Sequence, residues 1–107
     1  MSQAQAQMIG ADPAEVASNV YKPVLENERI RLFDVRFQPG DKAIMHYHPQ
    51  HVVYVLTDGT NRLAFPDGTS QDIDLKAGSA IWLPAGQHET TNIGKTEVRL
   101  LVFELKS

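Results

Sequence analysis

The chain of 107 residues contains no cysteine. This absence excludes disulfides, thiolate nucleophiles, iron–sulfur clusters and cysteine-based zinc sites. Long apolar runs are also missing: none approaches the roughly 20 residues that span a bilayer. The first residues, MSQAQAQM, lack the basic and apolar segments of a signal peptide. We therefore expect a cytoplasmic protein with no membrane contact.

Basic residues are scarce as well. Ten Lys and Arg stand against 13 Asp and Glu, which gives a net charge of -3, whereas a general nucleic-acid binder needs a basic face. Glycine-rich phosphate loops of the Walker or Gly-x-Gly-x-x-Gly type do not occur. With 42% hydrophobic and 21% charged residues, the composition is that of one globular domain that binds no nucleic acid.

Short β-rich segments separated by turn residues occupy most of the chain. Turns are expected at Pro39-Gly40-Asp41 and Pro66-Asp67-Gly68, and the Asp58-Gly59 pair favours a hairpin. Leu32 and Phe33 break the alternation of the first strand, which indicates a bulge. About eight strands are predicted: residues 29–37, 43–48, 52–56, 62–65, 72–76, 80–83, 88–92 and 97–105. This spacing predicts an all-β sandwich or barrel.

The N-terminal residues differ in composition from the rest. Residues 1–11 are polar and of low complexity, which is typical of a frayed tail. Asp12, Pro13 and Glu15 then supply the N-cap, the first-turn proline and the N3 acid of a short helix. The sequence therefore predicts two parts: a flexible tail with one short helical turn at residues 1–19, and a β-barrel domain at residues 20–107.

Two of the expected strands, residues 52–56 and 98–105, are apolar on both faces. In an antiparallel sandwich, one face of a strand normally meets solvent. A chain of this length buries only about 60–65% of its unfolded surface, so it has little structure of its own to cover a second face. We therefore expect a homodimer.

Three of the four histidines lie within six residues. His46 and His48 share one face of their strand because alternate residues point the same way. His51 has the wrong parity for a continuous strand. However, Pro49 and Gln50 favour a turn, after which His51 can face back toward the first two. A cluster of imidazoles is therefore expected at this turn.

The fourth histidine follows the turn at Pro84-Ala85-Gly86 and can approach from a neighbouring strand. The alternative is a polar strand edge that carries histidines without a metal. Neutral imidazole, however, is the commonest metal ligand at physiological pH. The sequence thus predicts one divalent transition metal per chain, Fe, Zn, Ni, Mn or Cu. The candidate ligands are His46, His48, His51 and His88.

The spacing of these residues resembles the two sequence motifs of the cupin family. The matching positions are Gly40, His46, His48 and Gly59 for the first motif, and Gly78, Pro84, Gly86, His88 and Asn92 for the second. The resemblance covers residues 40–92 and is to small single-domain bacterial cupins. It implies a double-stranded β-helix, or small jelly roll, with a metal inside.

The metal-binding glutamate of the first cupin motif is missing here. Counting back from Gly59 puts Val52 in its place, whereas alignment on the following strand puts His51 there. The second alignment is preferred because Val52 offers no ligand atom. Three- and four-histidine sites occur among cupins, including oxygenases that lack the glutamate.

The second motif is one residue short between Gly86 and His88. A shift of one residue reverses the direction of a side chain in a strand. Gln87 and Glu89 are therefore alternatives to His88, although His88 is favoured as the ligand.

Three functions fit these residues, and the fold alone decides none of them. The resemblance implies a metal-dependent dioxygenase acting on a small organic substrate, because neutral histidine ligands leave positions on the metal open. A metal-dependent isomerase or lyase needs a group that moves protons, and no obvious general base lies beside the histidines. A non-catalytic small-molecule-binding cupin is the third possibility. The sequence assigns no catalytic residue.

Overall fold

The computed structural model describes residues 10–106, and these form nine strands and one short helix. In chain order the elements are α1 (Pro13–Val16), β1 (Tyr21–Glu26), β2 (Ile30–Phe37), β3 (Lys42–His48), β4 (His51–Val55), β5 (Gly59–Ala64), β6 (Ser70–Leu75), β7 (Ala80–Leu83), β8 (Gly86–Asn92) and β9 (Val98–Leu105). Within this part of the chain, no helix is long and apolar enough to cross a bilayer.

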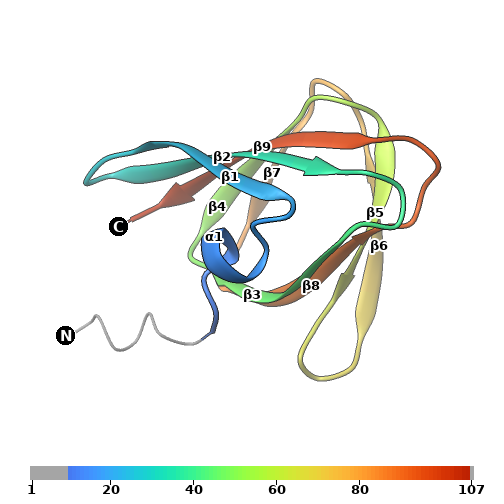
Figure 1. The fold of residues 1–107 in the computed structure, drawn as a ribbon, viewed down its shortest axis with the longest axis horizontal. Helices are drawn as coiled ribbons and strands as arrows, with labels where there is room; N and C mark the ends of the chain where they lie inside the picture. The colour runs from blue at the N-terminus through green and yellow to red at the C-terminus, as the bar shows by residue number, and fades with distance from the viewer. Residues whose placement is uncertain (1–9, 107) are drawn as a thin grey trace.

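Two antiparallel sheets enclose a shared interior (Figure 1). One sheet has five strands in the order β1-β2-β9-β4-β7, and the other has four in the order β3-β8-β5-β6. Most consecutive strands alternate between the two sheets, so the chain winds around the interior. This arrangement confirms the predicted fold class, an all-β double-stranded β-helix or jelly roll with a short N-terminal helical turn.

Three details of the predicted strands are corrected by the structure. Asp58-Gly59 does not form a hairpin, because β4 and β5 belong to different sheets; turn chemistry is local and does not specify the next strand's partner. A ninth strand, β1, contains Pro23, which an edge strand tolerates. The bulge lies in β1, where the register shifts between Pro23 and Leu25, opposite Leu32 and Phe33.

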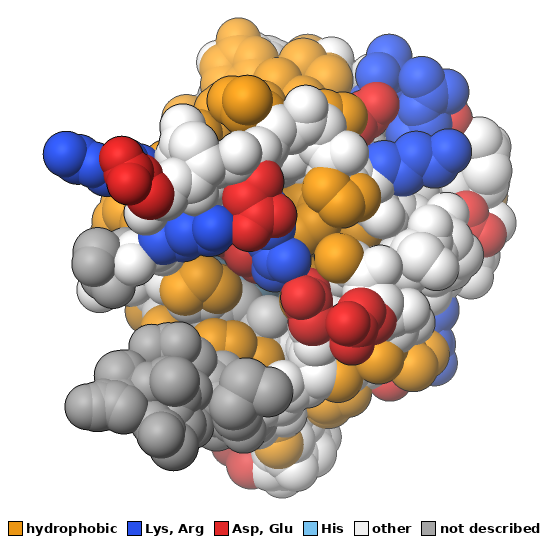
Figure 2. Space-filling model, turned by 60° about the vertical axis from the view of Figure 1, so that its left-hand side comes forward, with side chains coloured by type: hydrophobic (Ala, Val, Ile, Leu, Met, Phe, Trp, Pro, Cys, Tyr) orange, Lys and Arg blue, Asp and Glu red, His pale blue; other side chains and the backbone are white. Residues whose placement is uncertain are grey.

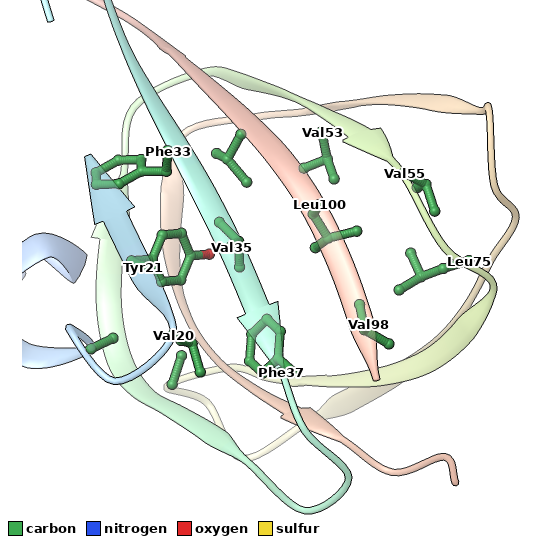
Figure 3. Close-up of a cluster of buried hydrophobic side chains, with 13 residues drawn as sticks. Val20, Tyr21, Phe33, Val35, Phe37, Val53, Val55, Leu75, Val98 and Leu100 are labelled. Carbon is green, nitrogen blue, oxygen red and sulfur yellow. The ribbon is translucent and has the colours of Figure 1, made fainter. Parts of the chain in front are cut away.

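Hydrophobic side chains from both sheets fill much of the interior. In β9, buried residues alternate with half-buried ones along the whole strand, as the two-residue period of a strand requires. Figure 3 shows side chains from β1, β2, β4, β6 and β9 pointing toward one another. The fully buried aromatic residues are Phe33 and Phe37. This core holds the strands that carry the histidines.

The segment before β1 is fixed to the barrel. Asp12 caps α1, as predicted, by accepting a hydrogen bond from the Ala14 N–H at 2.9 Å. Ala17 is fully buried, and the Tyr47 N–H of β3 donates to the Ala11 carbonyl at 2.8 Å. The division into a tail at 1–19 and a barrel at 20–107 stays a prediction, and residues 1–9 lie outside the described residues.

Candidate metal centre

Three histidines converge inside the barrel from two neighbouring strands. His46 and His48 alternate on β3 and share its inward face, and His88 on β8 lies directly opposite His46. His46 and His48 are fully buried, and His88 is 8% exposed. One ring nitrogen from each lies within 4.8 Å of those of the other two, as the ligands of a single metal ion must. The predicted grouping of these three residues is therefore found.

His51 reaches the cluster from the opposite sheet. It is the first residue of β4 and is buried. Its ring centroid lies 4.3 Å from that of His48 and 6.3 Å from that of His88. The predicted turn at Pro49 and Gln50 does bring His51 back toward the others. His51 is nevertheless not part of the three-histidine group whose ring nitrogens meet, and its role as a ligand stays a prediction.

The orientation of three imidazoles is fixed through Nδ1. Each of these nitrogens bonds to an oxygen: His46 to the Ile44 carbonyl at 2.6 Å, His48 to Glu104 Oε2 at 2.6 Å, and His51 to the Pro49 carbonyl at 2.8 Å. Since these oxygens accept, the proton of a neutral imidazole lies on Nδ1. The Nε2 lone pair is then left for a ligand, which is how proteins commonly present histidine to a metal.

The Nε2 atoms have few partners within residues 10–106. His46 Nε2 is buried and has no hydrogen-bond partner there. His48 Nε2 accepts a hydrogen bond from the Tyr21 hydroxyl at 3.2 Å. A buried polar atom without a partner is costly and indicates a missing ion, water or ligand. A divalent metal fits this position, because it would take the lone pair that the protein leaves unused.

The electrostatics of the site keep the imidazoles neutral. Burial lowers the pKa of His46 and His51, and at His48 burial and the neighbouring imidazoles lower the pKa well below its usual value. Burial, followed by the nearby imidazoles, lowers the pKa of His88 to about 2. Neutral imidazole is the form that binds metals, so the unpaired Nε2 lone pair of His46 is available to a metal at pH 7.

A partly buried ionic network, which the sequence did not reveal, supports His48. Glu104 holds the His48 Nδ1–H through Oε2, while its Oε1 accepts two hydrogen bonds from Arg31, at 3.0 and 2.8 Å. Arg31 also donates to both carboxylate oxygens of Asp12, each at 3.0 Å. This chain of contacts anchors the N-terminal segment to a histidine of the site.

A signal for Glu104 does exist in the sequence. Glu104 has the same phase as the buried residues Val98, Leu100 and Val102 of β9, so a carboxylate falls where alternation demands an inward side chain. An inward charge in a buried strand needs a partner. Burial raises the pKa of Glu104, and the hydrogen bonds and charge of Arg31 oppose that rise.

The alternative ligands lie outside the cluster. Glu89 pairs with Lys42 at 3.3 Å, and Gln87 lies between His88 and Gly86 on the half-buried phase of β8. Val52 is half-buried on the outward phase of β4, whereas His51 points inward. Of the two candidates for the place of the cupin glutamate, His51 is therefore the one that points toward the cluster, and its assignment there stays a prediction.

A narrow cavity of about 50 Å³ adjoins the histidines between the two sheets. His51 and His88 line it, together with the polar residues Asn61 and Thr90 and the hydroxyl-bearing Tyr21. The remaining lining side chains are apolar: Phe37, Val53, Leu63, Ile73, Leu75, Ile81, Leu83, Leu100 and Val102. A small molecule placed here would contact two residues of the histidine cluster, His51 and His88.

Comparison with known proteins agrees with this architecture. The sequence profile described as "Cupin domain" matches residues 33–104. Among proteins with curated descriptions, none is significantly similar to the chain. A solved cupin domain from Bordetella pertussis Tohama I is 30% identical, with a TM-score of 0.76; the match covers 82% of this chain and 93% of that one.

More distant solved structures share the fold. A double-stranded β-helix protein from Klebsiella pneumoniae is 21% identical with a TM-score of 0.67, and the match covers 81% of this chain and 76% of that one. The polyketide cyclase RemF from Streptomyces resistomycificus is 22% identical with a TM-score of 0.60, and the match covers 81% of this chain and 64% of that one. At these identities the likeness concerns the fold alone.

Proposed function

The chain belongs to the cupin family, and from this premise we propose that it is a metal-dependent dioxygenase acting on a small organic substrate. His46, His48 and His88 would hold one divalent metal, with His51 as the fourth ligand. The observation that carries the proposal is the convergence of neutral, buried imidazoles, one of which presents an Nε2 without a partner. Imidazole ligands suit Fe, Zn, Ni and Cu.

When bound, a redox-active metal in an all-histidine set supplies open coordination positions for substrate and O2. The chain's own residues prepare that site. Glu104, held by Arg31, fixes the His48 ring and its tautomer through the 2.6 Å contact to Nδ1. The apolar lining of the cavity excludes water from the neighbourhood of the histidines.

The lining of the cavity favours oxygenase chemistry over proton transfer. Among the described residues that line it, none carries a carboxylate or an amine. Glu104 is engaged by both His48 and Arg31. A general base for an isomerase must lie within hydrogen-bond reach of the proton that it removes. The described lining offers no carboxylate for that role.

A metal-dependent isomerase or lyase is the second candidate, and Tyr21 is the observation that favours it. Its hydroxyl donates to His48 Nε2 at 3.2 Å and lines the cavity. Burial raises the Tyr21 pKa, so the hydroxyl stays protonated. Once the His48 Nε2 lone pair binds a metal, that hydroxyl would be released to donate a hydrogen bond to a bound carbonyl oxygen. RemF, which shares this fold, is described as a cyclase. A non-catalytic cupin is the remaining alternative.

Metal analysis of protein purified without a histidine tag tests the proposal. We expect one equivalent of metal per chain, lost in a His46→Ala, His48→Ala double variant. Arg62→Ala, which changes only an exposed salt bridge with Asp72, is the matched control.

The Fe(II)-loaded protein should then consume O2 with a small organic substrate. Full metal occupancy in the double variant would overturn the site. Turnover without O2 would favour the isomerase or lyase, and stoichiometric binding without turnover the non-catalytic cupin.

A further inference from the structure

Asn61 is a buried amide whose oxygen is unused. It lies on the inward phase of β5 and is 4% exposed. Its Oδ1 is buried and has no hydrogen-bond partner among residues 10–106. An unpaired buried acceptor destabilises a fold, because the group has lost its water without gaining a partner.

The cross-strand neighbour of Asn61 shows what a structural amide does in this barrel. Asn92 on β8 lies directly opposite in the register. Its Nδ2 donates to the carbonyls of Phe37, at 3.0 Å, and Thr96, at 2.9 Å, and its Oδ1 accepts from the Gly94 N–H at 2.9 Å. The Asn92 amide is therefore fully hydrogen-bonded and stabilises a turn, whereas the Asn61 Oδ1 forms no hydrogen bond with the described residues.

Asn61 also lines the cavity that adjoins the histidines. The other polar residues of the lining are Tyr21, His51, His88 and Thr90, and the remaining lining is apolar. The cavity thus combines two imidazoles and an unpaired amide oxygen with a mostly apolar lining. A few precisely placed polar groups in an apolar pocket are what orient a small ligand.

We propose that Asn61 determines ligand specificity, its Oδ1 accepting a hydrogen bond from a hydroxyl group of a small molecule whose carboxylate end is directed to the histidine-bound metal. The proposal rests on the proposed function, since it needs the metal to hold that carboxylate. The chemical class is a short hydroxycarboxylic acid: the unpaired Asn61 Oδ1 requires a hydrogen-bond donor such as a hydroxyl, and since the described lining contains no Lys or Arg, a carboxylate would have to be held by the metal. A site built to pair a hydroxyl discriminates strongly against an analogue without it, because the buried acceptor is then left unpaired.

The test compares three hydroxy acids with their methyl counterparts: glycolate with propionate, 3-hydroxypropionate with butyrate, and 4-hydroxybutyrate with valerate. Affinities are measured by calorimetry on Ni(II)-loaded wild-type protein, Asn61→Leu and Thr90→Val. Thr90→Val is the matched control, because it removes a hydroxyl from the same cavity without touching the unpaired amide. Metal affinity of each protein is measured first.

We expect the wild type to prefer at least one hydroxy acid over its methyl counterpart by about tenfold or more. The preference should persist in Thr90→Val and vanish in Asn61→Leu, with metal affinity unchanged. Metal-free Asn61→Leu should also melt about 4 °C or more above the wild type, because the unpaired acceptor is gone.

The outcomes separate the two proposals. If the wild type takes up no metal, the proposed function fails, and the melting temperature of metal-free Asn61→Leu still decides whether its acceptor is unpaired. If metal binds, then equal affinities within every pair, no binding of any of the six acids, or a preference that survives in Asn61→Leu would each overturn the role of Asn61. A lower melting temperature in Asn61→Leu would do the same.

Discussion

The two sheets differ in polarity on both of their faces. The five-stranded sheet contributes most of the buried hydrophobic residues, including Phe33, Val35 and Val102. The four-stranded sheet turns histidines, Thr90 and Asn61 toward the same interior. The five-stranded wall therefore supplies most of the apolar core, with His51 and Glu104 as its buried polar residues. The four-stranded wall carries most of the buried polar groups, which a stability-optimised core would not contain.

The outer faces repeat the difference. A row of apolar residues runs in register across the five-stranded sheet: Leu25, Leu32, Phe103, Val52 and Trp82. The corresponding face of the four-stranded sheet carries exposed pairs such as Arg62 with Asp72, at 2.7 Å. No histidine is visible on the face in Figure 2, where charged side chains lie beside hydrophobic ones. The difference suggests that one sheet is solvated outside and the other is covered.

Removing a core side chain of the five-stranded sheet should give the largest effect. Phe37 is fully buried at the end of β2, so Phe37→Ala should lower the free energy of unfolding by about 3–5 kcal/mol. Urea unfolding of the metal-free protein measures this. Metal affinity per folded chain should stay within threefold of the wild type; a collapse of metal binding with intact folding would show that the two walls are not independent.

Glu104 connects the two walls, and its loss should weaken the metal site. Replacing a carboxylate that orients a metal-binding histidine costs about 10–100-fold in metal affinity. Glu104→Gln should therefore weaken Zn(II) binding by this factor in a chelator competition. Glu89→Gln, whose side chain pairs with Lys42 at 3.3 Å near the surface, is the matched control. Equal affinities in the two variants would remove Glu104 from the site.

Lowering the pH should destabilise the metal-free protein through the buried histidines. The unfolded chain binds a proton at each histidine near pH 6.5, whereas the lowered pKa of His88, about 2, keeps it neutral in the fold. The free energy of unfolding therefore has its highest value, as far as His88 is concerned, above pH 6.5, and it decreases as the pH falls below 6.5. Between pH 7.5 and 5.5, His88 should account for about 1.4 kcal/mol. In urea unfolding over the same pH range, the His88→Gln variant should lose about 1.4 kcal/mol less stability than the wild type. Equal losses in the two proteins would contradict a neutral, buried His88.

The sequence predicted the local features of this molecule well. Alternation and Gly and Pro turns indicated the strands, and the spacing of His46, His48 and His88 indicated the cluster that the structure brings together. These features depend on neighbours in the chain. Gly40 and Gly68, for example, have positive φ at predicted turns, which glycine adopts without strain.

The features that the sequence did not predict depend on strand pairing. Arg31 meets Glu104 across 73 residues of sequence because β2 pairs with β9, and no local pattern states that pairing. The hairpin expected at Asp58-Gly59 failed for the same reason: a turn fixes direction, not the sheet that the next strand joins. The sequence likewise did not single out Asn61, because its place in the cavity lining depends on how the two sheets pack together.

The last prediction concerns the apolar outer row of the five-stranded sheet, where a substitution should have the smallest effect on the stability of the subunit itself. We propose that a second copy of the chain covers this row. Trp82 is 56% exposed at one end of it and Leu25 is 51% exposed at the other. Asp34 and Arg99 lie on the same face and pair with each other at 3.5 Å, so their charges are balanced within the subunit and leave the apolar row free to meet the same row of a second copy.

Trp82→Ser tests this interface. An exposed side chain outside the core changes the stability of its own subunit by only about 0.5 kcal/mol, and metal affinity should not change. Light scattering should instead show wild-type protein at twice the 11.9 kDa of the chain and the variant near the single mass. Arg62→Ser, on the solvated outer face of the four-stranded sheet, should remain dimeric. A wild-type mass near 11.9 kDa at all micromolar concentrations would leave the row uncovered by a second copy, and the contrast between the two sheets would then concern their inner faces alone.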